Sequence, residues 1–199
     1  MDSRFRAAFV NSLPGHKPAN LIGTVSADGL SNLAIVSSVV HIGSDPPLLA
    51  FISRPLSVER HTLGNILETG VYTVNAVPES SIPQAHQTAA RYEREVSEFD
   101  AAGITPRFAD DFAAPFVTQS ELSIGLQFVS QIELPNNTVM VIGEILRVEV
   151  AEAAVLEDGA LDFSRIDAVS VTGLDTYYKP RKSARMAYAK PDLPPRKIR

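Results

Sequence analysis

The chain has 199 residues, of which 45% are hydrophobic and 21% charged, and it contains no cysteine. This length is sufficient for one compact domain with its own core, and the lack of cysteine excludes disulfides, thiolate metal ligands and a catalytic thiol. The net charge of −5 disfavours nucleic acid as a partner. No apolar stretch approaches the roughly 18 residues that cross a bilayer, and no signal-peptide pattern is present, so we expect a cytoplasmic protein without a membrane partner.

The first half of the sequence has the apolar pattern of short β-strands separated by turn residues. Strands are expected at residues 21–26, 31–40, 48–52 and 71–77. The first two are joined by Asp28-Gly29, a strong signal for a tight hairpin turn. A helix is expected before the fourth strand; it ends at Gly70 and is capped by either Ser57 or Thr62, between which the sequence does not decide.

The second half combines one helical pattern with long strands. Apolar residues recur at helical spacing at Ala85, Ala89, Tyr92, Val96 and Phe99, which predicts one amphipathic helix that ends near Gly103. An irregular acidic loop is expected after it, at residues 106–115. Further strands are expected at residues 122–134, 139–150 and 166–172, with a turn-rich junction at 135–137.

Together these elements predict a mainly β protein with peripheral helices, built as a closed or split antiparallel barrel. Glycine-rich nucleotide-binding loops and alternating βαβ units are both missing, so a doubly wound fold is not expected. We expect one domain at residues 1–178. The tail at 179–199 carries eight basic residues, one acidic residue and four prolines. It is therefore expected to be extended and to dock on the domain or on a partner subunit.

A basic loop rich in hydroxyl groups follows the third expected strand and opens the helix. Ser53 and Arg54 stand at the end of the strand, and Arg60 and Thr62 stand near the start of the helix. A helix N-terminus favours a bound anion because its N–H groups are unpaired, and arginine and hydroxyl side chains add further donors. The pattern predicts a phosphate-binding site, although both arginines could instead be solvated surface charges.

Three motifs stand in a fixed order around this loop: Asn-Leu-Ala-Ile-Val-Ser at 32–37, Asp-Pro-Pro at 45–47 and Arg-His-Thr-Leu-Gly-Asn-Ile at 60–66. Ser-Glu-Phe at 97–99 and Ile-Gly-Glu-Ile at 142–145 follow downstream. In this order the motifs resemble the flavin reductase-like family of flavoredoxin type. The resemblance implies an FMN-binding split β-barrel, antiparallel and of Greek-key type.

The resemblance also implies which residues form the site. Main-chain and hydroxyl groups near Ser37 and Ser38 would face the flavin ring. His86 and Glu98 are candidates for the substrate side, although His86 could be a surface residue and Glu98 could pair with Arg91 or Arg94. No set of His, Asp and Glu residues has the spacing of metal ligands, so no metal is expected. The expected cofactor-binding residues are Asn32, Ser37, Ser38, Val39, Ser53, Arg54, Arg60, His61 and Thr62.

From the resemblance we expect an FMN-dependent oxidoreductase that takes hydride from NAD(P)H and passes electrons to a small-molecule acceptor. Because a flavin carries the reactive atoms itself, no catalytic side chain is predicted. Two alternatives stay open. One is a non-catalytic flavin-binding or electron-carrier component of a monooxygenase system. The other is a related split barrel that binds haem or has lost its cofactor.

The expected strand at 139–150 is apolar on both faces over its first half. Val139, Val141 and Ile145 alternate there with Met140, Ile142 and Leu146. One face can fill the barrel, whereas the other needs cover, which a partner subunit would provide. Relatives of this kind form dimers in which both chains wall the site. We therefore expect a homodimer.

Overall fold

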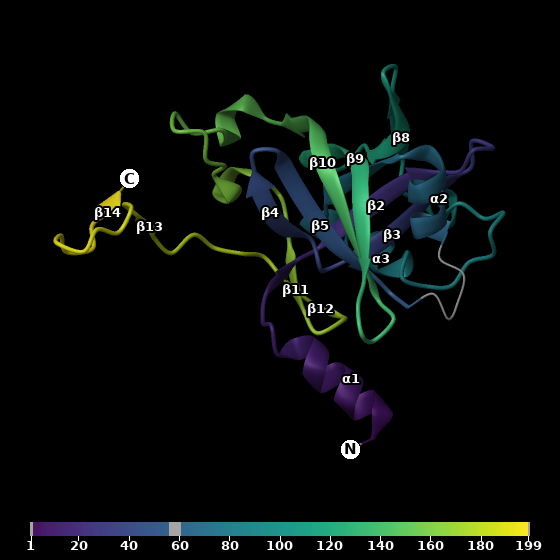
Figure 1. Ribbon diagram of the computed structural model, residues 1–199, viewed down its shortest axis with the longest axis horizontal. Helices are drawn as coiled ribbons and strands as arrows, with labels where there is room; N and C mark the ends of the chain where they lie inside the picture. The colour runs from purple at the N-terminus through teal and green to yellow at the C-terminus, as the bar shows by residue number, and fades with distance from the viewer. Residues whose placement is uncertain (1, 56–60, 199) are drawn as a thin grey trace.

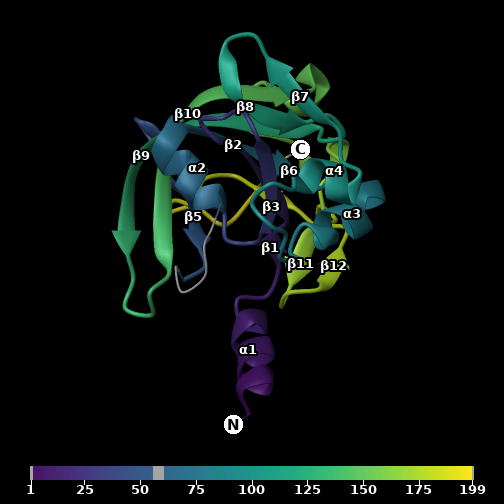
Figure 2. The ribbon, with the colours of Figure 1, turned by 90° about the vertical axis from the view of Figure 1, so that its right-hand side faces the viewer.

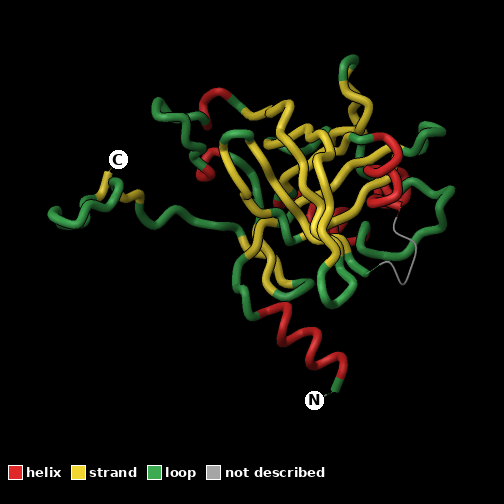
Figure 3. The backbone as a smooth tube through the Cα atoms, in the orientation of Figure 1, coloured by secondary structure: helices red, strands yellow, loops and turns green. Residues whose placement is uncertain are grey.

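The computed structural model describes residues 2–55 and 61–198 of the chain. Its main feature is a seven-stranded antiparallel sheet with the strand order β3-β2-β6-β9-β10-β5-β4 (Figure 1). Strands dominate the body of the molecule and helices lie at its periphery (Figure 3), which confirms the predicted mainly β fold. The sheet strands are β2 (Asn20–Val25), β3 (Ser31–Val36), β4 (Val40–Ser44), β5 (Pro47–Ser53), β6 (Val71–Ala76), β9 (Leu122–Glu133) and β10 (Val139–Val150).

The curved sheet encloses an apolar core that helix α2 (His61–Thr69) also enters. Val141 of β10 and Phe51 of β5 are paired across the two strands and point into this core. The ring of Tyr72 lies 5.7 Å from that of Phe51, and burial raises the pKa of its phenol. Gly143 is required beside it, since a Cβ there would lie 2.3 Å from the Tyr72 hydroxyl.

Both predicted hairpin turns are confirmed. Gly29 has a φ of 86° in the turn between β2 and β3, a conformation that favours glycine. Asn137 has a φ of 63° in the turn between β9 and β10, where asparagine is tolerated. The predicted helix end at Gly70 is also confirmed, because α2 ends at Thr69 and Gly70 donates a hydrogen bond to the Ile66 carbonyl at 2.9 Å.

The expected single strand at residues 31–40 is wrong. It is split into β3, which ends at Val36, and β4, which begins at Val40. These two strands lie at opposite ends of the strand order, so the chain has to leave one edge of the sheet and join the other. Ser38 lies in this crossing, and its hydroxyl accepts a hydrogen bond from the Ile52 N–H at 2.9 Å.

The single helix expected from Ala85 to Phe99 is also wrong. Two short helices, α3 (Ile82–Gln87) and α4 (Glu98–Ala102), stand in its place with a loop between them. Ala85 and Phe99 are both fully buried in one core cluster, so the apolar spacing marked burial correctly. The helix is interrupted because the segment must place both Thr88 and Glu98 against the main chain of β3.

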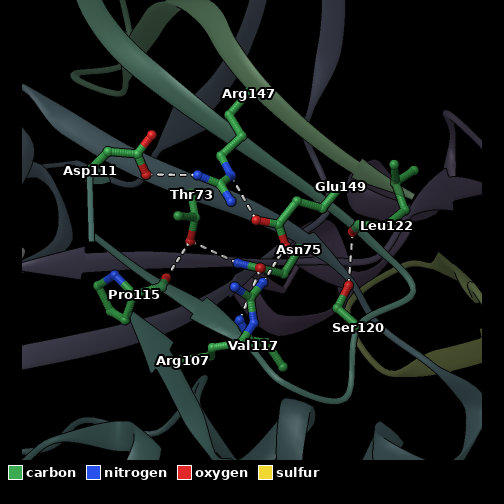
Figure 4. Close-up of polar contacts among 10 residues, drawn as sticks. All are labelled: Thr73, Asn75, Arg107, Asp111, Pro115, Val117, Ser120, Leu122, Arg147 and Glu149. Atoms are coloured by element: carbon green, nitrogen blue, oxygen red, sulfur yellow. Dashed lines mark hydrogen bonds and ion pairs between the residues drawn. The ribbon is translucent and has the colours of Figure 1, made fainter. Parts of the chain in front are cut away.

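The acidic loop expected at 106–115 is instead a hairpin of β7 (Pro106–Ala109) and β8 (Phe112–Val117). Buried side chains of β6 fasten it: the Thr73 hydroxyl donates to the Pro115 carbonyl at 2.6 Å, and the Asn75 side-chain oxygen accepts from the Val117 N–H at 3.0 Å (Figure 4). On the outer side, the guanidinium groups of Arg107 and Arg147 lie 5.0 and 5.8 Å from the centre of the Phe116 ring.

A second, three-stranded sheet packs beside α3 (Figure 2). It joins β1 (Lys17–Pro18), β11 (Ser170–Thr172) and β12 (Thr176–Tyr178), so the last strand expected at 166–172 begins four residues later than predicted. His16, next to β1, places its Nδ1 3.2 Å from the Ser170 hydroxyl. The remaining short 3₁₀ helices are η1 (Glu79–Ser81), η2 (Glu152–Ala154) and η3 (Phe163–Arg165).

Both end segments of the described chain project from the body in Figure 1, and Figure 2 shows the N-terminal helix from a second side. Helix α1 (Ser3–Ser12) is capped by the Asp2 side chain and buries none of its residues. The tail begins with ion pairs from Lys179 to Glu79 at 2.7 Å and from Lys182 to Asp162 at 3.5 Å. It ends in a small hairpin of β13 (Arg185–Met186) and β14 (Lys197–Ile198), in which Arg185 pairs with Asp158 of the body.

Candidate functional site

A cleft of about 630 Å³ lies where β3, the end of β5, the start of α2 and the second sheet meet. Eight of the residues expected in the site line it together. The segment between α3 and α4 adds further lining residues, from Thr88 to Tyr92. The eight expected residues in the lining are Asn32, Ser37, Ser38, Ser53, Arg54, His61, Thr62 and Glu98.

One end of the cleft has donors and positive charge. Ser53 is the last residue of β5 and Arg54 follows it, and His61 and Thr62 are the first two residues of α2. The Asn32 amide donates a hydrogen bond to the Thr62 hydroxyl at 3.0 Å, which ties the start of α2 to β3. Thr62 thus lies inside the helix and not at its cap. Arg60 and Ser57, the other cap candidate, lie outside the described residues.

The middle of the cleft has apolar walls with hydroxyl groups between them. Ile35, Val36 and Phe51 line it together with Ser37 and Ser38. The ladder between β4 and β5 stops short of this point, and the Ser38 hydroxyl replaces it by bonding to the main chain of Ile52. The main chain of residues 37–39 therefore lies outside the ladder. Val39 does not line the cleft; it packs against the barrel core.

Side chains from the α3–α4 region bind the free edge of β3. The Glu98 carboxylate accepts a hydrogen bond from the Leu33 N–H at 3.0 Å, and the Thr88 hydroxyl accepts one from the Ile35 N–H at 3.0 Å. Glu98 is only 7% exposed although it also lines the cleft. Its bond to Leu33 gives the carboxylate a positioning role, and its expected contact with substrate stays a prediction.

The second sheet supplies a wall of the cleft that sequence reasoning missed. Lys17, Val171 and Tyr177 are direct cross-strand partners, and all three line the cleft. His86 does not line the cleft, but its Nδ1 lies 3.0 Å from the Tyr177 hydroxyl. Burial, and then the charge of Asp175, raise the pKa of the Tyr177 phenol, which therefore stays protonated at neutral pH.

No local motif signals this wall. Lys17 and Tyr177 are far apart in the sequence, and only the pairing of β1 and β12 with β11 brings them together.

Within residues 2–55 and 61–198, no group of three His, Asp or Glu side chains has the arrangement of a metal site. In the same part of the chain, no helix combines the length and hydropathy needed to cross a bilayer.

Residues 16–168 match the model of the flavin reductase like domain, so the chain belongs to this family. Flavin-related oxidoreductases are the class of protein that the family and the split barrel define. The expected family and fold are therefore confirmed.

Three solved structures are similar to the chain. A split-barrel protein from Shewanella frigidimarina NCIMB 400, assigned as a flavin reductase, is 50% identical, with 95% of this chain and 94% of that chain covered and a TM-score of 0.91. Flavoredoxin of Desulfovibrio vulgaris (Miyazaki F) is 25% identical, with 89% and 92% covered and a TM-score of 0.73. Nitrilotriacetate monooxygenase component B from Bacillus cereus is 21% identical, with 92% and 93% covered, and its TM-score of 0.81 shows a shared fold.

Proposed function

We propose that the cleft binds FMN and that the protein is an oxidoreductase which takes hydride from NAD(P)H and passes electrons to a small-molecule acceptor. The observation that carries this proposal is the cleft itself. It combines a donor-rich, positively charged end with an apolar middle, in a chain of the flavin reductase like family. A molecule with one phosphate and a flat aromatic ring matches both parts.

The donor-rich end supports FMN over a longer flavin nucleotide. Ser53, Arg54 and Thr62 offer hydroxyl and guanidinium donors where α2 begins. Charge-assisted hydrogen bonds of this kind are the strong ones for phosphate. Their clustering at one end suits a single phosphate group. Arg60 would add a second guanidinium, and its role stays a prediction because it lies outside the described residues.

The middle of the cleft supports placement of a flavin ring. When bound, FMN supplies the group that accepts and donates hydride, and the protein supplies orientation and electrostatics. Ile35 and Val36 would exclude water from the ring. Ser38 fixes the main chain of the crossing segment through Ile52, which orients the groups that would face the ring.

A comparison of flavins tests the proposed cofactor. FMN should bind and raise the melting temperature, since a ligand that binds only the folded state stabilises it by about 2.7 kcal/mol at 100 times its Kd. Riboflavin, which lacks the phosphate, should stabilise much less. Arg54→Ala should weaken FMN binding by about tenfold or more and leave riboflavin unchanged, because a charge-assisted bond contributes about 1.5–3 kcal/mol. Arg181→Ala, in the tail, is the matched control, and equal losses for both ligands would contradict the assignment.

A carrier role is the second candidate, since component B of a monooxygenase shares the fold. Steady-state oxidation of NADH and NADPH by the purified protein separates the two roles, because a carrier alone would show almost none. Fold by itself does not decide between them. The absorption spectrum of the purified protein separates both from a haem-binding split barrel, which would show a Soret band in place of flavin absorption.

We further propose that the protein is a homodimer. The outer face of β10 is apolar where it meets its neighbours. Ile142 and Val40 both pair with Ala50 of β5, and Met140 pairs with Ile132 of β9. Val40 is 48% exposed and Ile132 is 49% exposed, which leaves an apolar surface on the sheet. Sedimentation at micromolar concentration should give twice the chain mass of 21.5 kDa. A monomer that binds FMN tightly would contradict a site shared between subunits.

A further inference from the structure

Lys17 places a partly buried cation in the cleft wall formed by the second sheet. Its ammonium donates to the main-chain carbonyls of Asn11 and Gly173, each at 3.1 Å. Among residues 2–55 and 61–198, none of the ion pairs includes Lys17. Burial lowers its pKa, which is the direction for a cation that has lost water and gained no carboxylate. An ammonium has three N–H donors, so one is left after the two carbonyls.

The neighbours of Lys17 complete a polar surface on this wall. Val171 and Tyr177 follow it in register across β11 and β12, and both line the cleft with it. The Tyr177 hydroxyl, which is backed by His86, adds a donor or acceptor to the same wall. This surface comes from different elements than the donor-rich end at Ser53 and Thr62 and than Arg91 of the α3–α4 segment, so the cleft has positive charge away from the donor-rich end.

We propose that Lys17 binds the anionic group, carboxylate or phosphate, of the second molecule that occupies the cleft beside the cofactor. The proposal rests on the proposed function, in which the single phosphate of FMN occupies the donor-rich end and leaves Lys17 for another ligand. An anion would restore to this ammonium the favourable interaction that burial removed. A neutral ligand gains nothing comparable. The competing interpretation is that Lys17 only links α1 to the turn at Gly173.

The experiment compares a charged probe with its neutral isostere on the FMN-loaded protein. Benzoate, benzamide and inorganic pyrophosphate are titrated by calorimetry into the wild type and into Lys17→Gln, Lys17→Met and Lys17→Arg. We expect at least one anion to bind ten times more weakly to the Gln and Met variants and to retain most of its affinity for the Arg variant. Benzamide should be unaffected in all of them. Lys179→Gln, which removes a charge outside the cleft, is the matched control.

Each outcome decides the question. If only benzoate loses affinity for the Gln and Met variants, the ligand is a carboxylate. If only pyrophosphate loses affinity, the ligand group is the phosphate of a nucleotide. If both anions lose affinity, the site is a general anion subsite. Equal effects on benzoate and benzamide, unchanged binding of both anions, or no anion binding to the wild type would overturn the proposal. FMN affinity is measured first on the same variants and should stay within a factor of two of wild type. If the wild type binds no FMN, the proposed function fails, and the anion titrations on the FMN-free protein still test Lys17.

Discussion

Two buried polar regions of this molecule contain similar side chains that have different roles. At the β6–β8 contact, Thr73 and Asn75 bind main-chain groups of β8, and both are fully buried (Figure 4). At the edge of β3, Thr88 and Glu98 bind main-chain N–H groups in the same way, but they come from a separate segment and Glu98 and Thr88 also line the cleft. The first arrangement fastens β8 to β6. The second holds an edge in place while keeping space beside it for a ligand.

The largest effect is expected from breaking the closed region. Asn75→Ala removes the acceptor for the Val117 N–H and the donor to the Leu21 carbonyl and the Thr73 hydroxyl. Each buried group left without a partner costs about 1–3 kcal/mol, so the free energy of unfolding should fall by about 3 kcal/mol or more. Urea denaturation measures the loss. A change below about 1 kcal/mol would show that the network does not hold β8.

Glu98 tests the open region. Glu98→Ala leaves the Leu33 N–H without its acceptor and should lower the free energy of unfolding by about 2 kcal/mol. Glu98→Gln keeps an acceptor oxygen and should lose less than half as much. The comparison is made by urea denaturation alongside NAD(P)H oxidation. If Glu98→Gln keeps full stability and loses turnover, the carboxylate acts on the substrate and is more than a positioning residue.

Ser38 should give a smaller effect. Its hydroxyl is a partner for both the N–H and the carbonyl of Ile52, at 2.9 and 3.3 Å, in a partly buried position. Ser38→Ala should therefore lower the free energy of unfolding by about 1 kcal/mol, the net contribution of an ordinary hydrogen bond. Thermal denaturation measures it, and Ser183→Ala in the exposed tail is the control. A loss as large as that of Asn75→Ala would remove the distinction between the two regions.

The smallest effect concerns the exposed tail, where ionic contacts replace buried polar ones. The hydrogen bond from Arg185 to Asp158, and then that from the Ala160 N–H, lower the pKa of the Asp158 carboxyl. Because the pKa of Asp158 is lowered in the folded state, the contact is fully stabilising at pH values above the ordinary pKa near 3.8. This stabilisation is lost as the pH falls through the lowered pKa. NMR relaxation of Met186 should show greater mobility below about pH 3 than at pH 6. In the Asp158→Asn variant, Met186 should be mobile at both pH values.

Local signals in the sequence predicted the local parts of the fold. Asp28-Gly29 and the 135–137 junction form turns because the residues themselves favour those backbone angles. The helix expected from Ala85 to Phe99 failed for a physical reason. The spacing indicated burial of Ala85 and Phe99 in one core, whereas the backbone between them is set by two hydrogen bonds to β3, which span 53 and 65 residues of the chain.

The candidate site divides in the same way. Asn32, Ser53, Arg54 and Thr62 lie close in sequence to recognisable motifs, and the cleft contains all four. Lys17 and Tyr177 come from short strands at the two ends of the domain, and only their shared pairing with β11 places them in the same wall. Pairing between distant short strands leaves no periodic trace in a single sequence, so that half of the cleft was not foreseeable.

The contact between Lys17 and the Asn11 carbonyl has a practical consequence for spectroscopy. Helix α1 buries none of its residues, yet its last turn touches the cleft wall through this bond. The chain has no cysteine, so Arg6→Cys on the exposed helix would introduce a unique thiol for a fluorophore. The label would sit outside the cleft while its helix remains tethered to Lys17. Its rotational mobility would then report, in real time and without occupying the cleft, when a ligand reaches that wall.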